Sequence, residues 1–236
     1  MKIFIDPGHN YSGADSGAVG NGLREQDVTF AIADKLKYLL IKNGYEVKMS
    51  REKLTVNIGT TVEQSIRGRY EMSNEWGADL FLSIHCNSGG GTGTECFIYS
   101  SQSEAKEYAE RIQNAIVDRL NLADRGVKVR TDLGVLRGTT APAVLIETGF
   151  IDNPADATLL RDRQQDYAEA IFEGVTGILP NRTEELTSAN DIVWEYTYRG
   201  IVLDPEGMKK EMQENPDGRL YWLARKALQY IRERGF

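Results

Sequence analysis

The sequence is poor in several kinds of residue, and each scarcity excludes a class of protein. It holds two cysteines in 236 residues, which is too few for a disulfide scaffold. It has no apolar run of about 18 residues, so we expect no insertion into a membrane. It also has no dense cluster of lysine and arginine, and its net charge is -7, so we expect no nucleic-acid partner.

The N-terminus has no apolar stretch followed by a cleavage site, which a secretory signal would need. The chain opens instead with MKIFIDPGH, which has the pattern of a short strand and a turn. We therefore expect a protein made in the cytoplasm without an export signal of its own, or the trimmed form of a secreted one.

Residues 1–179 alternate between strand-like and helix-like patterns. Short apolar or alternating runs predict strands at 3–5, 45–49, 79–86, 95–99 and 143–146. Apolar residues at helical spacing predict helices at 24–43, 61–76, 103–122, 153–163 and 165–179. This alternation predicts an α/β fold, with a twisted, mostly parallel sheet of about six strands and helices on both faces.

The composition changes at Pro180. The polar stretch 180–187 predicts a linker, and helical patterns at 188–236 predict a small all-α C-terminal module of three helices. A module of this size is marginally stable alone. We therefore expect it to lean on the first domain or to mediate self-association.

The two cysteines, Cys86 and Cys96, fall in two predicted strands. We interpret them as small apolar residues in neighbouring strands, because a cytoplasmic setting disfavours a disulfide. A catalytic Cys86–His85 pair is also disfavoured, since successive side chains on a strand point to opposite faces.

Only two histidines occur, and both stand at predicted carboxyl ends of strands. His9 follows Asp-Pro-Gly, and His85 lies in SIHCNS. Ligands of open α/β sheets bind outside these strand ends, so the two imidazoles could begin a metal site. The alternative is that each histidine is partly buried, hydrogen-bonded and structural.

Two acidic residues could complete such a site. Glu25 follows a Gly-rich loop and opens a predicted helix, where the helix dipole alone would favour a carboxylate. Glu147 follows the apolar run AVLI, and a buried carboxylate is costly unless it is paired or used. Near a metal it could accept a proton from water. The alternative for Glu147 is an ion pair with Arg69 or Arg137.

Several motif blocks occur in a characteristic order: IFIDPGH, GLREQDV, ADLFLSIHCNS, GTE and APAVLIETGFIDNPAD. Over residues 1–179 they resemble the zinc-dependent N-acetylmuramoyl-L-alanine amidases of the AmiC/CwlV type, the amidase-3 family. The resemblance implies that His9, Glu25 and His85 hold one Zn²⁺ and that Glu147 is the catalytic carboxylate. It also implies that zinc-activated water hydrolyses the amide between N-acetylmuramic acid and L-alanine in bacterial peptidoglycan.

Other positions match the family as well. Arg51, Arg69, the Ser73-Asn74 pair and Arg137 are expected to be structural or to frame the substrate. Asn10 departs from the family, in which a second glycine commonly follows DPGH, and we expect it to alter the rim of the site. The long inhibitory helical insertion of some relatives is missing, so we expect an open cleft.

An amidase domain followed by a short module resembles the arrangement of phage endolysins, which act on the wall after release. Residues 188–236 would then bind the wall, a partner or another copy. One alternative is a zinc peptidase or deacylase acting on another amide. Zinc carboxypeptidases place their first histidine and glutamate only a few residues apart, whereas His9 and Glu25 are sixteen apart. Another is a non-catalytic wall-binding protein, which the complete set of site residues disfavours.

Overall fold

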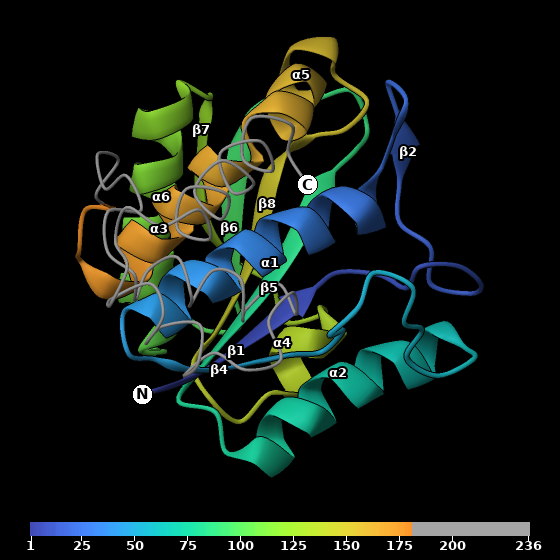
Figure 1. Ribbon diagram of the computed structural model, residues 1–236, viewed down its shortest axis with the longest axis vertical. Coiled ribbons are helices and arrows are strands. Elements are labelled where there is room, and N and C mark those ends of the chain that lie inside the picture. The colour runs from blue at the N-terminus through green and yellow to red at the C-terminus, as the bar shows by residue number, and fades with distance from the viewer. Residues whose placement is uncertain (181–236) are drawn as a thin grey trace, which may run out of the picture. The chain divides into compact units, whose positions relative to one another are not determined.

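The computed structural model describes residues 1–180, which form a six-stranded sheet flanked by helices (Figure 1). Its strand order is β4-β1-β5-β8-β6-β7. The strands are β1 (Lys2–Pro7), β4 (Glu46–Met49), β5 (Leu80–Asn87), β6 (Thr94–Ile98), β7 (Asp124–Val129) and β8 (Ala143–Phe150). Only the β6–β8 pair is antiparallel within this sheet, so the predicted mostly parallel α/β sheet is confirmed.

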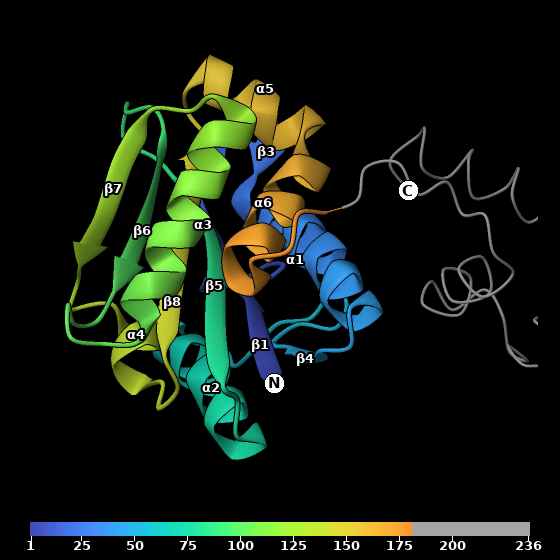
Figure 2. The same ribbon diagram turned by 90° about the vertical axis from the view of Figure 1, so that its left-hand side faces the viewer.

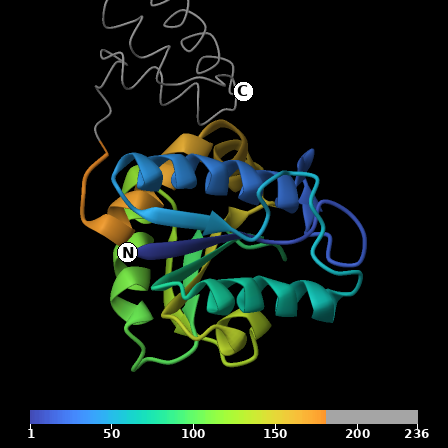
Figure 3. The ribbon, with the colours of Figure 1, turned by 60° about the horizontal axis from the view of Figure 1, so that its bottom comes forward.

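Helices cover both faces of the sheet. They are α1 (Glu25–Lys42), α2 (Val62–Trp76), α3 (Ala105–Leu120), α4 (Gly134–Gly138), α5 (Pro154–Asp162) and α6 (Gln164–Thr176). Apolar residues of α1, α3 and α6 pack on one face, whereas those of α2 and α4 pack on the other. Figure 2 shows α3 beside α6, and Figure 3 shows blue α1 and teal α2 on opposite sides of the sheet. None of the described helices is long and apolar enough to cross a membrane.

The alternation of side chains along the central strands sends polar groups to one face. On β5, Phe81 packs with α2 and α4, and Ser83 and His85 follow it at two-residue intervals. On β8, Leu145 lies in the same cluster, and Glu147 comes two residues later. The carboxyl halves of these strands therefore place polar side chains on the α2 face.

Local signals fix the helix boundaries. Thr61 caps α2 by accepting a hydrogen bond from the Gln64 backbone N–H, and Gly77 ends the helix with φ of 67°. Asn153 caps α5, whose first residue is Pro154. These helices agree with the predicted ones to within a residue at each end, whereas α6 ends at Thr176, three residues earlier than predicted.

Some elements were not predicted, one expectation was wrong, and other predictions concern residues that the structure does not describe. The pattern analysis did not predict β7, α4 or the two-stranded hairpin of β2 (Val19–Gly20) and β3 (Leu23–Arg24). Strand β8 separates β5 from β6, so Cys86 and Cys96 are not on neighbouring strands, and both are free and buried. The predicted linker from residue 181 onwards and the three-helix module lie outside the described residues.

Candidate metal centre

The three predicted metal ligands come together at the carboxyl edge of the sheet. His9 Nε2 and His85 Nδ1 each lie 3.1 Å from the same oxygen, Glu25 Oε1. The two imidazole rings meet edge to face, with centroids 4.8 Å apart. One ligand atom from each residue falls within 4.8 Å of the others, so the three could hold a single metal ion.

His9 occupies a backbone conformation that non-glycine residues rarely adopt. It follows β1 with φ of 64°. The preceding carbonyl, on Gly8, accepts hydrogen bonds from Arg51 Nη2 at 3.2 Å and Thr29 Oγ1 at 3.1 Å. Such a conformation persists only where the surroundings over-determine it, and these buried donors do so here.

Glu25 is the first residue of α1, and only 3% of it is exposed. Its Oε2 accepts a hydrogen bond from the Ala18 N–H, and its Oε1 accepts one from the Cys86 N–H. Burial alone would raise the pKa of Glu25, but the hydrogen bonds with His85 and His9 outweigh it and hold that pKa well below its usual value. The carboxylate therefore stays charged between the two imidazoles.

Two glycines let the backbone pass directly over the ligands. A Cβ on Gly8 would lie 2.5 Å from Cε1 of His85. A Cβ on Gly17 would lie 2.7 Å from Oε2 of Glu25 and 2.8 Å from Cδ2 of His9. The DPG turn and the Gly-rich loop thus pack on the ligand set and leave it little freedom.

Glu147 lies beside this cluster, one strand away. It pairs in register with His85 across the β5–β8 ladder, so both side chains point to the same face. No ion pair joins it to Arg69 or Arg137 within residues 1–180, which argues against the salt-bridge alternative. Its Oε2 is buried and finds no hydrogen-bond partner there.

The surroundings of Glu147 bring the pKa of its carboxyl close to neutral pH. Burial, against the opposing effect of His85 and together with the nearby Glu25 and Glu95 carboxylates, raises its pKa to about 7. A general base or acid works best when its pKa lies close to the working pH. Glu147 therefore has the environment of a group that exchanges protons.

Glu95 on β6 is a member of the site that pattern analysis did not single out. It pairs in register with Glu147, and only 4% of it is exposed. Asn87 donates a hydrogen bond to its Oε1 at 2.6 Å, and Lys128 and Arg125 of β7 form ion pairs with its Oε2. Glu95 stands two residues before Phe97, which packs with α2 and α4, so both side chains lie on the same face of β6. This spacing was the signal that could have indicated Glu95.

A buried ionic network lies beneath the ligands. Asp6 on β1 is fully buried and accepts hydrogen bonds from Arg69 Nη1 at 2.7 Å, Ser50 Oγ at 2.6 Å and Ser83 Oγ at 2.8 Å. The guanidinium of Arg69 is buried in this network, which favours the structural alternative of the two expected for it.

Asn10, the departure from the family that we expected to alter the rim of the site, points its side chain into the interior. It is buried, and its amide pairs with the backbone of Ile58 in both directions, at 3.1 Å and 2.8 Å. Arg69 Nη2 also donates to its side-chain oxygen at 3.2 Å. The side chain is drawn inwards because these groups satisfy its polar atoms, so it ties the loop after His9 to the loop before α2.

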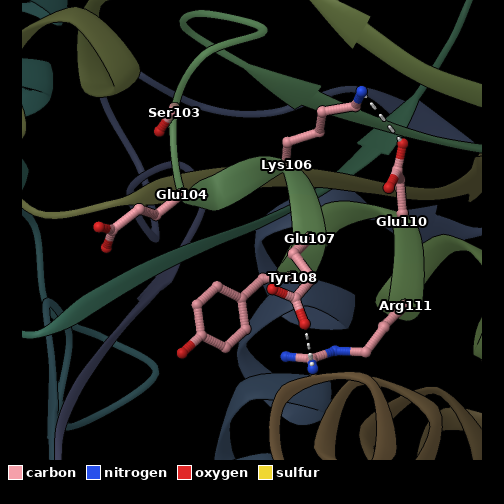
Figure 4. Close-up of a pocket in the computed structure, with 7 residues that line it drawn as sticks. All are labelled: Ser103, Glu104, Lys106, Glu107, Tyr108, Glu110 and Arg111. Carbon is pink, nitrogen blue, oxygen red and sulfur yellow. Dashed lines mark hydrogen bonds and ion pairs between the residues drawn. The ribbon is translucent and has the colours of Figure 1, made fainter.

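The surface at the start of α3 is a shallow depression without comparable chemistry (Figure 4). Its charged side chains include two ion pairs with helical spacing, Lys106–Glu110 and Glu107–Arg111. Pairs of this kind are typical of a solvated helix surface. This depression contains none of the candidate site residues.

The fold and the site together define an α/β protein with a candidate single-metal centre and, beside it, a half-buried carboxyl whose Oε2 has no hydrogen-bond partner within residues 1–180. The family model described as N-acetylmuramoyl-L-alanine amidase, Amidase_3, matches residues 3–177. The chain belongs to this family, as the ordered motif blocks indicated.

Similar proteins come from bacteria and from a phage. The chain is 43% identical over 164 residues to the sporulation-specific N-acetylmuramoyl-L-alanine amidase of Bacillus subtilis, covering 68% of this chain and 60% of that protein. It is 36% identical over 237 residues to the endolysin of Bacillus phage SPP1, covering 95% of this chain and 80% of the endolysin. The chain thus spans about three fifths of the length of the first of these relatives.

A solved structure has the same fold. The catalytic domain of CwlV, an N-acetylmuramoyl-L-alanine amidase from Bacillus (Paenibacillus) polymyxa var. colistinus, is 32% identical and superposes with a TM-score of 0.65. The match covers 75% of this chain and 97% of that domain. It therefore accounts for the α/β domain as a whole.

Proposed function

We propose that this protein is a peptidoglycan hydrolase that cleaves the amide bond between N-acetylmuramic acid and L-alanine. His9, Glu25 and His85 would hold one zinc ion, and Glu147 would be the catalytic carboxylate. The observation that carries the proposal is the half-buried Glu147 carboxyl in register with His85, whose Oε2 is buried and has no hydrogen-bond partner within residues 1–180. The names of the similar amidases support the substrate.

The ligand set fits zinc. Two imidazoles and one carboxylate, with a position left open, are a set that catalytic zinc uses. Metal–ligand distances of about 2.0–2.1 Å in a tetrahedron place ligand atoms about 3.3 Å apart. The 3.1 Å separations between Glu25 Oε1 and the two imidazole nitrogens are close to this value. The carboxylates that favour a proton on His9, raising its pKa to about 9 against the effect of burial, would equally stabilise a cation.

The metal and Glu147 would then have separate tasks in hydrolysis. When bound, zinc would polarise the amide carbonyl and lower the pKa of water. Glu147 would accept a proton from the attacking water and deliver it to the nitrogen of L-alanine. The C–N bond would then break and L-alanine would leave as a neutral amine. A pKa of about 7 lets the same carboxyl act first as a base and then as an acid.

The wall assay tests this proposal directly. Purified protein, with and without a chelator, is incubated with bacterial cell walls, and new amino groups and reducing sugars are measured. We expect chelator-sensitive release of L-alanine amino groups without reducing ends. Failure of the zinc-loaded protein on several wall types would contradict the proposal, and activity only on other amides would instead support a zinc peptidase or deacylase.

Replacement Glu147→Gln separates the catalytic role from a ligand role. We expect turnover to fall by about 10²–10⁴-fold, while the zinc content stays unchanged. Glu71→Gln, on the exposed surface of α2, serves as the matched control and should keep full activity. Loss of zinc from the Glu147 variant would mean that this residue is a ligand.

The arrangement of the whole chain supports an endolysin-like protein that reaches the wall after release. Similarity to the phage SPP1 endolysin extends over 95% of the chain. We assign residues 1–179 to catalysis, 180–187 to a linker, and 188–236 to a module that binds the wall, a partner or a second copy. Removing the module should leave cleavage of soluble muropeptides intact but weaken cosedimentation with walls.

A further inference from the structure

The imidazole of His9 is held between two carboxylates. Its Nδ1 lies 2.9 Å from Asp15 Oδ1, and its Nε2 lies 3.1 Å from Glu25 Oε1. Because both ring nitrogens face an acceptor, a half-turn of the ring would bring carbon atoms to both carboxylates. The orientation of the ring is therefore fixed, and only one of its nitrogens points towards the other candidate ligands.

Asp15 is itself held from the opposite side. Its Oδ2 accepts a hydrogen bond from Ser65 Oγ of α2 at 2.5 Å and lies 3.8 Å from Arg69 Nη2. Its backbone carbonyl accepts the Asn10 N–H at 2.7 Å and closes the loop after His9. The carboxylate is only 12% exposed. A loop residue thus joins His9 to the buried network that contains Arg69.

We infer that Asp15 is a positioning residue for the metal centre, an inference that rests on the proposed zinc site. It accepts the Nδ1 proton of His9, which leaves the Nε2 lone pair directed at the position shared with Glu25 and His85. Histidines that bind metals commonly donate their other N–H to a carboxylate, and the loss of such a partner weakens metal binding by about 10–100-fold. Asp15 lies in a Gly-rich loop and would not itself touch the metal or the substrate.

Zinc affinity tests this role without measuring activity. Dissociation constants of the full chain are measured by competition with a chromogenic chelator. We expect Asp15→Ala to bind zinc about 10–100-fold more weakly, and Asp15→Asn to lose less, because its side-chain oxygen still accepts the Nδ1 proton. The control is Asp152→Ala, which removes another loop carboxylate, one that accepts the Gly89 and Gly90 N–H groups. Its zinc affinity should equal that of the wild type.

The tautomer of His9 gives a readout that a purely structural role would not move. The chain has only two histidines, so ¹⁵N-histidine labelling yields two imidazole systems in all. In the zinc-loaded wild type we expect a slowly exchanging proton on Nδ1 of His9 and metal-bound shifts on its Nε2. In Asp15→Ala the Nδ1 proton signal should broaden or disappear, whereas Asp15→Asn should retain it.

The outcomes separate this inference from the proposed function. Equal zinc affinity of Asp15→Ala and wild type, equal weakening in Asp152→Ala, or a proton on Nε2 of His9 would overturn the positioning role alone. Failure of the wild type to bind zinc would overturn the zinc site and the positioning role together. Zinc binding with the expected tautomer, but no wall hydrolysis, would leave the Asp15 role standing and overturn the proposed reaction.

Discussion

Replacement of Asp6 by asparagine should destabilise the α/β domain strongly, because the buried guanidinium of Arg69 would lose its nearer counter-charge and keep only Asp15, 3.8 Å from Nη2. Asp6 is fully buried, and Arg69 Nη1 lies 2.7 Å from its Oδ1. Ser50 and Ser83 donate to the same carboxylate. Asparagine keeps the shape of the side chain but removes its charge and replaces one acceptor oxygen by an NH2 donor, which the donors around Asp6 cannot pair with as they paired with the carboxylate.

The magnitude follows from the burial of both partners. Removing one member of a buried ion pair costs about 3–5 kcal/mol. Arg69 would still donate to the Pro7 carbonyl at 2.8 Å and to Asn10 Oδ1 at 3.2 Å, so we expect the lower end of that range. A loss of about 3 kcal/mol corresponds to a decrease of roughly 6–12 °C in melting temperature for a domain of this size.

The effect should depend on pH in a defined direction. Burial alone would raise the pKa of Asp6, but Arg69 and the Ser50 hydroxyl outweigh it, so this pKa lies below its usual value of 3.8. A carboxyl with a lowered pKa contributes stability that is fully present above its unfolded pKa and is lost as the pH falls through the folded value. The difference between wild type and Asp6→Asn should therefore be largest at neutral pH and shrink below about pH 4.

Urea unfolding followed by circular dichroism between about pH 3 and pH 7 measures this difference. The matched control is Glu71→Gln, which breaks the exposed Arg67–Glu71 pair on α2 and should change the free energy of unfolding little. The reasoning would be refuted by an Asp6→Asn protein as stable as the wild type at pH 7. A stability difference that grows on acidification would refute it equally.

Two further substitutions test close packing, one at the site and one in the core. Gly8→Ala should abolish zinc binding measured by chelator competition and leave the far-ultraviolet spectrum native, because the added Cβ would lie 2.5 Å from the His85 ring; undiminished affinity would contradict the close contact. Tyr167→Phe should leave the melting temperature unchanged or raise it, because the buried Tyr167 hydroxyl finds no hydrogen-bond partner within residues 1–180. A loss above about 1 kcal/mol would show that this hydroxyl is satisfied after all.

The order and type of most elements could be predicted from the sequence. The helix at 61–76 was recognisable because its apolar residues recur at helical spacing. The strand at 143–146 was recognisable because it is a continuous apolar run. Strand β7 escaped because it has the sequence DRGVKV, with mostly exposed side chains at the edge of the sheet. Helix α4 escaped because five residues are too few to show a period.

The sequence by itself determined the four candidate residues of the site, since His9, Glu25, His85 and Glu147 each stand in an ordered motif block. Only the tertiary structure decided how they are supported. Strand order places Glu147 in register with His85, although 62 residues separate them in the chain.

The partners of these residues were equally a matter of tertiary structure. Arg69 pairs with Asp6, and no ion pair of Glu147 occurs within residues 1–180. Asp15 reaches His9 from a loop that carries no periodic signal. The physical reason is that periodicity reports which face of an element is buried. The pairing of buried polar groups depends instead on which elements the fold brings side by side.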